Sequence, residues 1–229
     1  MAKNLVITID GPAGAGKSTV SQALAVRLSY LYLDTGAIYR AIAYKVMQSG
    51  ILPDDDHQLS GLIANTDISL KKESHRLSIY LDGEDITEKI RTEGISMLAS
   101  TLSARPCVRE ALLQVQRKAG AKGGIVAEGR DMGTVVFPDA DYKFYLDADV
   151  AERARRRYEE IAAKSGGGDY HRVEEDLIIR DKQDRERAIA PLKPAENAVL
   201  IDSTNMSIQE VLDRMVSLIG FQNIQAREK

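Results

Sequence analysis

The chain has 229 residues, 44% of them hydrophobic and 28% charged, which is typical of a globular protein large enough to bury a substantial core. With 31 Lys and Arg against 34 Asp and Glu, its formal net charge is -3, which argues against a nucleic-acid-binding protein that relies on a broad basic surface. A single cysteine excludes an intramolecular disulfide framework and favours a reducing cytosol, and no apolar run reaches the roughly 18 residues of a membrane span.

The first part of the chain predicts strands and helices in alternation. Residues 5–9 form a short apolar run rich in β-branched side chains, which suits a strand buried on both faces of a parallel sheet. Apolar residues then recur at intervals of four over 17–28, which predicts a helix. A second strand is expected at 31–33, followed by a helix over 37–48 that ends before Pro53.

Residues 67–90 have a different pattern from their surroundings. Apolar and polar side chains alternate there, and an Asp82-Gly83 turn follows the alternating runs. This pattern predicts a small antiparallel, half-exposed element that forms a separate small lobe. Two helices are expected after it, at about 92–103 and 106–119.

The second half of the chain returns to buried strands separated by helices. Strands are predicted at 125–127, 142–146 and 199–201, and helices at about 149–164, 173–188 and 207–219. Strands that alternate with helices in this way indicate a parallel α/β sheet.

One motif carries more chemical information than any other part of the chain. It fits the pattern G-x-x-x-x-G-K-[ST] completely and lies between a predicted strand and a predicted helix: Gly11, Pro12, Ala13, Gly14, Ala15, Gly16, Lys17 and Ser18. Glycines let backbone N–H groups converge on phosphate oxygens, and the helix that follows offers its positive N-terminal end. Lys17 can reach the β- and γ-phosphates, and the Ser18 hydroxyl can bind Mg²⁺. The motif therefore predicts a nucleoside triphosphate site.

Arginines paired with acidic residues form a second informative set. They occur in four segments, which are Asp34–Arg40, Arg105–Arg109, Gly129–Gly133 and Arg180–Arg187. Arg130 and Asp131 follow a buried strand, and the carboxyl ends of parallel strands meet at the edge of the sheet where ligands bind. We therefore expect these two side chains to face the same cleft as the glycine-rich loop. Arginine is suited to clamping a phosphate through two parallel hydrogen bonds.

Two features each allow two interpretations. Asp10, directly before the glycine-rich loop, could support the metal through a water molecule or cap the end of its strand. Residues 152–187 hold ten Lys and Arg and ten Asp and Glu, which suits a salt-bridged, solvent-exposed helical hairpin. The same stretch could be a mobile lid with the glycine triplet 166–168 at its tip.

Four segments together resemble the bacterial cytidylate kinases, of the nucleoside monophosphate kinase group. They are ITIDGPAGAGKST, LDTGAIYR, EGRDMGTVVFPDA and DRERAIAPL, and the resemblance covers essentially residues 4–219. It implies an α/β fold, with a P-loop NTPase core whose five-stranded parallel sheet is flanked by helices, a small antiparallel insert and a helical lid. The whole chain would be one kinase domain, with its core at about 1–36, 120–150 and 188–229, its NMP-binding region at about 37–119 and its lid at about 151–187.

The resemblance also implies an activity, which is transfer of the γ-phosphoryl group of ATP to CMP or dCMP with Mg²⁺. Residues from Gly11 to Thr19 would bind the ATP phosphates, with Ser18 at the metal. The CMP phosphate would be held by Arg40 and Arg130, beside Thr35. Further roles would fall to Ser100, Arg109 and Asp131 at cytosine, Asp184 and Arg187 at the sugar, and Lys17, Arg130, Arg157 and Arg153 at the transferring phosphoryl group.

The chemistry of the bases agrees with this assignment. Cytosine presents an exocyclic amino donor, which a carboxylate such as Asp131 can accept, whereas uracil presents a carbonyl at the same place. CMP should therefore be preferred well ahead of UMP. The alternatives are a P-loop kinase for another small molecule, and a nucleotide-dependent ATPase that regulates a partner. We expect a cytoplasmic monomer that binds neither nucleic acid nor membrane.

Overall fold

The computed structural model describes residues 4–73, 76–165 and 167–225. The strands are β1 (Val6–Asp10), β2 (Leu31–Asp34), β3 (Ile68–Glu73), β4 (Arg76–Leu81), β5 (Glu84–Asp85), β6 (Ile125–Gly129), β7 (Tyr142–Asp147) and β8 (Val199–Asp202). The α-helices are α1 (Lys17–Leu28), α2 (Thr35–Ser49), α3 (Asp56–Ala64), α4 (Glu93–Leu102), α5 (Pro106–Gly120), α6 (Val150–Ser165), α7 (Tyr170–Glu186) and α8 (Ile208–Gln225). A single π-helical turn, η1, covers Met132–Val136.

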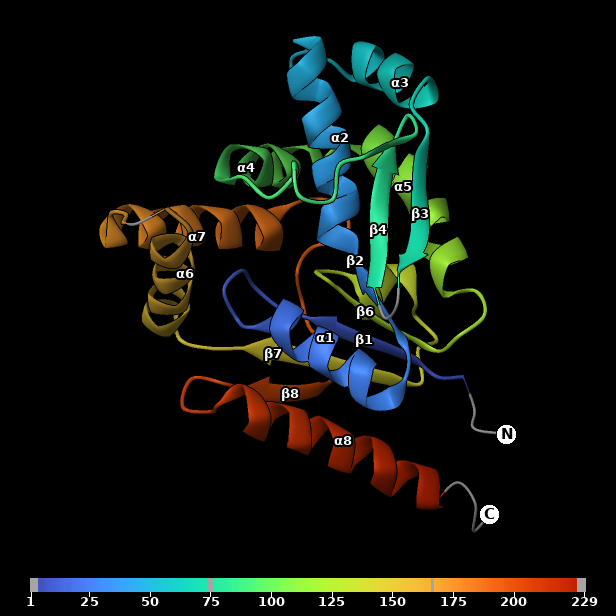
Figure 1. Cartoon of the computed structure of the whole chain (residues 1–229), viewed down its shortest axis with the longest axis vertical. Helices are drawn as coiled ribbons and strands as arrows, with labels where there is room; N and C mark the ends of the chain where they lie inside the picture. The colour runs from blue at the N-terminus through green and yellow to red at the C-terminus, as the bar shows by residue number, and fades with distance from the viewer. Residues whose placement is uncertain (1–3, 74–75, 166, 226–229) are drawn as a thin grey trace.

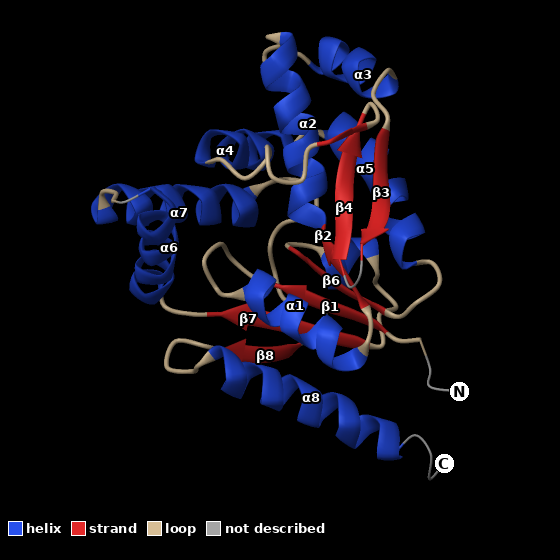
Figure 2. Cartoon of the chain, viewed as in Figure 1, coloured by secondary structure: helices blue, strands red, loops and turns tan. Residues whose placement is uncertain are grey.

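Five strands form the predicted parallel sheet (Figure 2), and the structure gives their order as β2-β6-β1-β7-β8. The central strand β1 pairs with β6 on one side and β7 on the other, and Thr8 lies opposite both Ala127 and Lys143. All five residues of β6 are buried, because helices cover both faces of the sheet. This explains why the strands have continuous apolar runs and not an alternating pattern.

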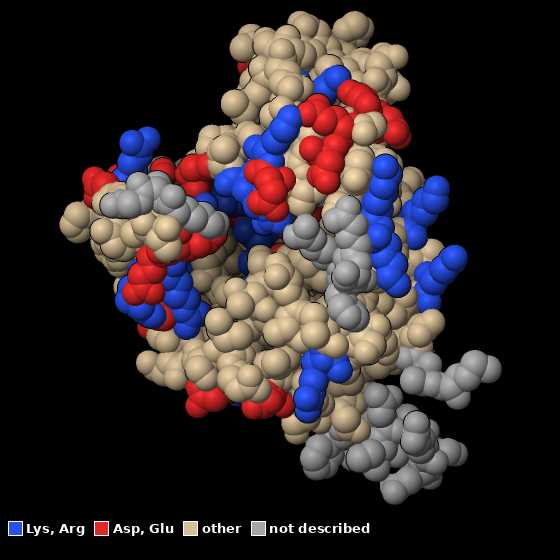
Figure 3. Space-filling model, viewed as in Figure 1, with Lys and Arg blue, Asp and Glu red and all other residues tan. Residues whose placement is uncertain are grey.

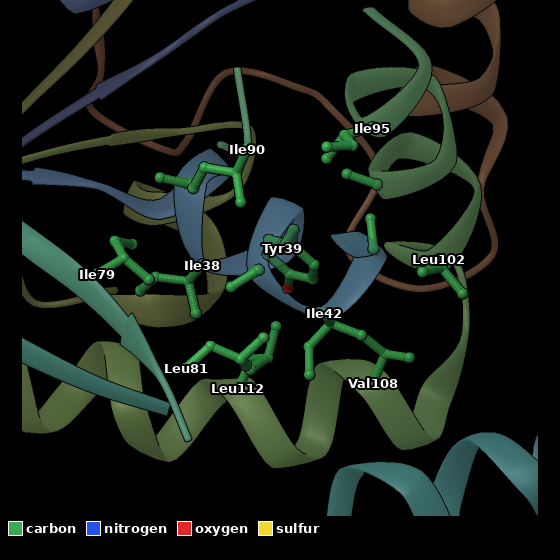
Figure 4. Close-up of a cluster of buried hydrophobic side chains, with 14 of the residues drawn as sticks. Ile38, Tyr39, Ile42, Ile79, Leu81, Ile90, Ile95, Leu102, Val108 and Leu112 are labelled. Atoms are coloured by element: carbon green, nitrogen blue, oxygen red, sulfur yellow. The ribbon is translucent and has the colours of Figure 1, made fainter. Parts of the chain in front are cut away.

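Two hydrophobic clusters lie on opposite faces of the sheet. One contains Ile7 and Ile9 of β1 with Leu24 of α1 and Met215 of α8. The other joins α2, α4 and α5 to the sheet, and Figure 4 shows some of its side chains. Because the five strands are parallel, they all end at the same side of the sheet. The Gly-rich loop after β1 and the loops after β2 and β6 leave the sheet there (Figure 1).

The strands β3, β4 and β5 form the predicted small antiparallel element, but they do not form a separate lobe. Strand β4 extends the main sheet, because Tyr32 of β2 and Arg76 of β4 pair in parallel register. Ile79 and Leu81 of β4 are buried in the same cluster as Ile38 of α2 (Figure 4). The alternating apolar residues face this shared core, so the predicted separate lobe is wrong.

Several element boundaries differ from the sequence prediction for local reasons. Helix α2 begins at Thr35 because the Asp34 carboxylate accepts a hydrogen bond from the Ala37 N–H, 2.9 Å away. Helix α3 was not predicted, since it is short and only Leu59 in it is buried. Its start is capped by Asp55, whose carboxylate accepts from Gln58 N–H. The final helix continues to residue 225.

Helices α6 and α7 pack against each other at one side of the molecule (Figure 1). The rings of Tyr158 and Tyr170 meet edge to face at 6.0 Å, and Asp169 caps the start of α7. The predicted tip of a lid falls between the two helices, although Gly166 lies outside the described residues. Among the helices of the described part of the chain, none is long and apolar enough to span a membrane.

Candidate active site

The Gly-rich loop, residues 11–18, is shaped by close contact with neighbouring backbone. Gly11 lies so near the end of β7 that a Cβ there would come within 1.9 Å of the Leu146 carbonyl oxygen. Gly14 has a φ of +77°, and a Cβ on it would lie 2.9 Å from the Arg153 carbonyl oxygen. A side chain at either position would force the loop away from its supports. The loop thus leads from β1 into the N-terminus of α1 as its motif predicts.

Lys17 is buried at the start of α1, with its ammonium 2.6 Å from the carbonyl oxygen of Pro12. Burial lowers the pKa of Lys17 to about 7, and the nearby Arg130 guanidinium contributes to the shift. An anionic ligand would favour the charged ammonium. Lys17 is therefore positioned to bind negative charge that is brought to the loop.

Glu128, at the end of β6, faces Lys17 and was not among the predicted site residues. Its side chain is buried, and its Oε1 accepts a hydrogen bond of 2.5 Å from the Tyr32 hydroxyl. Burial raises the pKa of Glu128, and the negative charge of Asp34 acts in the same direction. Within the described residues, Glu128 Oε2 makes no hydrogen bond. The sequence signal for this residue was an acidic side chain at the end of a buried strand.

Arg130 and Asp131 extend from the end of β6 into a network that includes α4, α5 and α7. Arg130 Nε donates to Asp184 Oδ2 at 2.7 Å, and Ser100 Oγ lies 3.5 Å from Asp184 Oδ1. Burial alone would raise the pKa of Asp184, but the guanidinium groups of Arg130 and Arg180 outweigh it and hold the pKa below its usual value. The structure therefore brings together residues that are up to 84 positions apart in the sequence.

Asp131 is buried between two arginines. It forms an ion pair with Arg109, and its Oδ1 lies 3.7 Å from Arg187 Nη2. The Arg109 and Arg187 side chains are fixed in turn by Ser103, through its carbonyl oxygen and its hydroxyl respectively. Two cations around one buried carboxylate keep its charge in a fixed place.

Thr35 and Arg40 belong to the first turns of α2. The Thr35 hydroxyl donates to the Glu128 carbonyl oxygen at 2.6 Å and so ties α2 to the end of β6. Arg40 Nη2 pairs with Asp34 Oδ2 at 2.8 Å. Asp34 thus both caps α2 and orients the Arg40 guanidinium at the same edge of the sheet.

Arg180 of α7 is a further site residue that the sequence did not single out from its charged segment. Its Nε is buried without a hydrogen-bond partner in the described part of the chain. Burial lowers the pKa of Arg180 to about 10, and the positive charge of Arg130 adds to the effect. Both guanidinium groups remain cationic at neutral pH. Two such cations held close together favour an anion between them.

Arg157 and Arg153 on α6 have different surroundings. Arg157 Nη2 pairs with Glu93 Oε2 of α4 at 2.5 Å, and its Nη1 pairs with Glu160 Oε2 at 2.7 Å. Arg153 is only 1% exposed, and its guanidinium reaches the Ala13 carbonyl oxygen and Asp181. The two arginines, predicted to act together, therefore point to different parts of the structure.

Most of the predicted site residues line one cavity of about 1130 Å³. They are Ala13, Gly14, Ala15, Gly16, Lys17, Ser18, Thr19, Thr35, Arg40, Ser100, Arg130, Asp131, Arg157, Asp184 and Arg187. The remaining four, Gly11, Pro12, Arg109 and Arg153, are buried and do not line it. Glu128 and Arg180 line the cavity as well. Figure 3 shows Lys and Arg side chains gathered in a hollow between the α6–α7 side and the body of the molecule.

Asp10 is the last residue of β1, and its side chain binds the turn after β6 and not the end of its own strand. Its carboxylate oxygens accept hydrogen bonds from the backbone N–H groups of Met132 and Gly133, each at 2.8 Å. Burial raises the pKa of Asp10 to about 6, although these two donors lower it. Asp10 therefore caps the π-helical turn η1 behind the cavity. In the described residues, no group of three or more His, Cys, Asp and Glu could hold a metal ion by itself.

Residues 7–220 match a family model described as cytidylate kinase. The cytidylate kinase of Geobacter sp. (strain M21) is 49% identical over 211 residues, which cover 92% of this chain and 91% of that protein. The cytidylate kinase of Desulfitobacterium hafniense (strain Y51) is 45% identical over 96% of this chain and 94% of its own length. Among solved structures, an uncharacterized protein from Eubacterium ventriosum ATCC 27560 shares the fold, with a TM-score of 0.50 at 11% identity over 95% of this chain and 99% of that one.

Proposed function

The chain belongs to the cytidylate kinase family, and from that premise we propose that it transfers the γ-phosphoryl group of ATP to CMP or dCMP, giving ADP and CDP or dCDP. The observation that carries this proposal is a single cavity with two sides. The Gly-rich loop with Lys17 lies on one side, and the network of Arg130, Asp131 and Asp184 lies on the other. A donor and an acceptor nucleotide can meet between them.

On the donor side, residues 11–19 would hold the ATP phosphates. The backbone N–H groups of the loop and the N-terminus of α1 favour an anion there, and Lys17 adds a positive charge. The residues also fit Mg²⁺, because the exposed Ser18 hydroxyl is a hard oxygen donor and the buried Glu128 carboxylate lies beside it. When bound with ATP, Mg²⁺ would neutralise charge on the phosphates.

On the acceptor side, the phosphate of CMP would lie among arginines. Arg40, Arg130 and Arg180 all line the cavity, and Asp34 and Asp184 orient the first two through ion pairs. Planar guanidinium groups can each give two parallel hydrogen bonds to a phosphate. The phosphate of CMP is largely ionised at neutral pH, so its oxygen can attack the γ-phosphorus without a general base.

The cytosine ring would be read by Asp131, with Ser100 and Arg109 beside it. Arg109 and Arg187 hold the Asp131 carboxylate in place, and this carboxylate can accept from the exocyclic amino group of cytosine. UMP would place a carbonyl against it and leave two acceptors unpaired. Asp184 and Arg187 would contact the sugar. This geometry supports a preference for CMP over UMP.

The transfer itself needs positioning and charge neutralisation. A bond forms between the CMP phosphate oxygen and the γ-phosphorus of ATP, while the bond to the leaving ADP oxygen breaks in line. Lys17, Arg130 and Arg157 would stabilise the charge on the transferring group. Arg157 is drawn to the rim of the cavity by Glu93 and Glu160, and helices α6 and α7 would act as a lid that excludes water.

We also propose where the enzyme acts, what it binds and how its domain is divided. A single cysteine and a net charge of -3 suit a cytoplasmic enzyme that acts on small molecules. Its partners would be the small-molecule substrates alone, with no nucleic acid, and the chain would act as a monomer. Its kinase domain would divide into a core, an NMP-binding region at 37–119 and a lid at 151–187.

The experiment that tests the function is ADP release measured with ATP and Mg²⁺ against AMP, GMP, UMP, CMP and dCMP. We expect strong turnover with CMP and dCMP only. Comparable turnover with UMP would leave the kinase reaction but contradict the role of Asp131. ADP release that does not depend on any acceptor would favour the alternative, a nucleotide-dependent ATPase. Turnover with a different small molecule would favour the other P-loop kinases.

A further inference from the structure

Arg153 is the largest fully buried side chain of the described residues. A buried guanidinium is costly unless its donors are paired. Arg153 Nε donates to the Ala148 carbonyl oxygen at 2.8 Å, and Nη1 donates to the Ala13 carbonyl oxygen at 2.9 Å. Nη1 also lies 2.6 Å from Asp181 Oδ2. The side chain is therefore held on several sides and does not extend into the cavity.

The contact with Ala13 links α6 to the Gly-rich loop across 140 positions of sequence. The backbones of the two segments also lie close together. A Cβ on Gly14 would come within 2.9 Å of the Arg153 carbonyl oxygen. Ala13 packs with Ala154 and Leu177 in a small apolar cluster that surrounds this contact. Movement of α6 would therefore shift the middle of the loop that we assign to the ATP phosphates.

The contact with Asp181 links α6 to the helix that carries the acceptor-side residues. Asp181 directly follows Arg180 and stands one helical turn before Asp184 on α7. Asp184 in turn holds Arg130. Contacts thus run from the Ala13 carbonyl through Arg153 to Asp181, and the backbone of α7 connects Asp181 to Asp184 and its partner Arg130.

We propose that Arg153 is a positioning residue that couples the donor loop to the acceptor side, and that it does not itself contact the transferring phosphoryl group. Through its contacts with Ala13 and Asp181, it would fix the position of the Gly-rich loop relative to α7. Binding of either nucleotide would then favour binding of the other. This departs from the role that the family resemblance implies for Arg153, and it rests on the proposed placement of ATP and CMP in the cavity.

The test is a double-mutant cycle with Arg153→Gln, Asp181→Asn and the double variant. For each protein, the affinity for CMP is measured by calorimetry with and without a non-hydrolysable ATP analogue, and kcat and KM are measured with ATP and CMP. Lys182→Gln is the matched control, because it removes one positive charge from an exposed position next to Asp181. Circular dichroism and thermal unfolding show whether each variant is folded.

In the wild type we expect the ATP analogue to tighten CMP binding by about fivefold or more, within the usual range for coupled sites. Each single variant should lose most of this effect, the double variant should lose no more than the worse single one, and Lys182→Gln should retain it. A wild type without coupling, or single variants that keep it, would overturn the proposal. So would a loss of kcat of about a hundredfold or more in Arg153→Gln alone, which marks direct contact with the reacting group. A wild type that does not phosphorylate CMP would instead refute the proposed function.

Discussion

The Tyr32 hydroxyl donates a hydrogen bond of 2.5 Å to Glu128 Oε1, although the two residues are 96 positions apart. They meet because β2 and β6 are neighbours, with Tyr32 opposite Val126 and Asp34 opposite Glu128. Burial raises the pKa of Tyr32 well above its ordinary value, and the charge of Glu128 acts in the same direction. The phenol therefore stays protonated and remains a donor at any pH at which the enzyme works.

Replacing Tyr32 by Phe should destabilise the fold without changing its shape. The change removes the donor from a buried carboxylate oxygen, which costs about 1–3 kcal/mol of unfolding free energy. Urea unfolding of Tyr32→Phe measures this cost. Tyr80→Phe is the control, since Tyr80 is half-buried and its ring contacts Lys71 through its face. Equal stability of Tyr32→Phe and wild type would show that the hydrogen bond contributes nothing.

Lys17→Ala should strongly reduce phosphoryl transfer and leave the fold intact. Lys17 is the cation that the Gly-rich loop itself supplies, and loss of one such charge at a transition state costs on the order of a hundredfold to a thousandfold in kcat. CMP-dependent ADP release measures the loss, and circular dichroism checks the fold. Turnover close to that of the wild type would contradict the role of the loop.

Asp131→Asn should reduce discrimination between CMP and UMP. The amide keeps the shape of the carboxylate beside Arg109, but it can also donate to the carbonyl of uracil. We expect the ratio of kcat/KM for CMP to that for UMP to fall by about tenfold or more. Ser100→Ala should reduce the same ratio to a smaller extent. An unchanged ratio in both variants would remove these residues from recognition of the base.

Asp10 should make the stability of the protein depend on pH in a particular direction. Its pKa is about 6 in the fold, where burial raises it from 3.8. Between these two values the folded protein holds a proton that the unfolded chain releases, so the free energy of unfolding should decrease as pH rises from about 4 to about 6. The slope from this group can approach about 1.4 kcal/mol per pH unit.

Asp10→Asn isolates that contribution, because it cannot titrate. The difference in unfolding free energy between wild type and Asp10→Asn, measured by urea unfolding at several pH values, should shrink as pH rises across this window. The variant should also be less stable at low pH, since its amide can accept only one of the hydrogen bonds from Met132 and Gly133. A difference that is constant with pH would contradict the raised pKa.

The parts of the fold that depend on local sequence were predictable. The five parallel strands followed from short apolar runs, and the Gly-rich loop followed from its motif together with the strand and helix around it. Helix α2 begins at Thr35, two residues before the predicted start, because the Asp34 carboxylate caps it, and the apolar pattern alone does not show this. Helix α3 was missed because it buries one side chain and has a weak pattern.

The parts that depend on partners distant in the sequence were not predictable. In the sequence, Glu128 cannot be distinguished from any other acidic residue at the end of a strand. Only the fold shows that Tyr32 and Lys17 lie beside it. Arg153 and Arg157 lie four residues apart on one helix, and the sequence cannot show that one is enclosed by Ala13 and Asp181 while the other faces Glu93. The arrangement of the whole chain decides which arginine reaches the cavity.

In the reaction that we propose, the cavity brings a phosphoryl donor to a CMP acceptor. The most direct measurement is phosphorus NMR of the wild-type enzyme with ATP, CMP and Mg²⁺, which follows every phosphorus atom through the reaction. We expect ADP and CDP to appear in equal amounts and no inorganic phosphate to form. ADP with an equal amount of inorganic phosphate and no CDP would contradict it, because the phosphoryl group would then have passed to water.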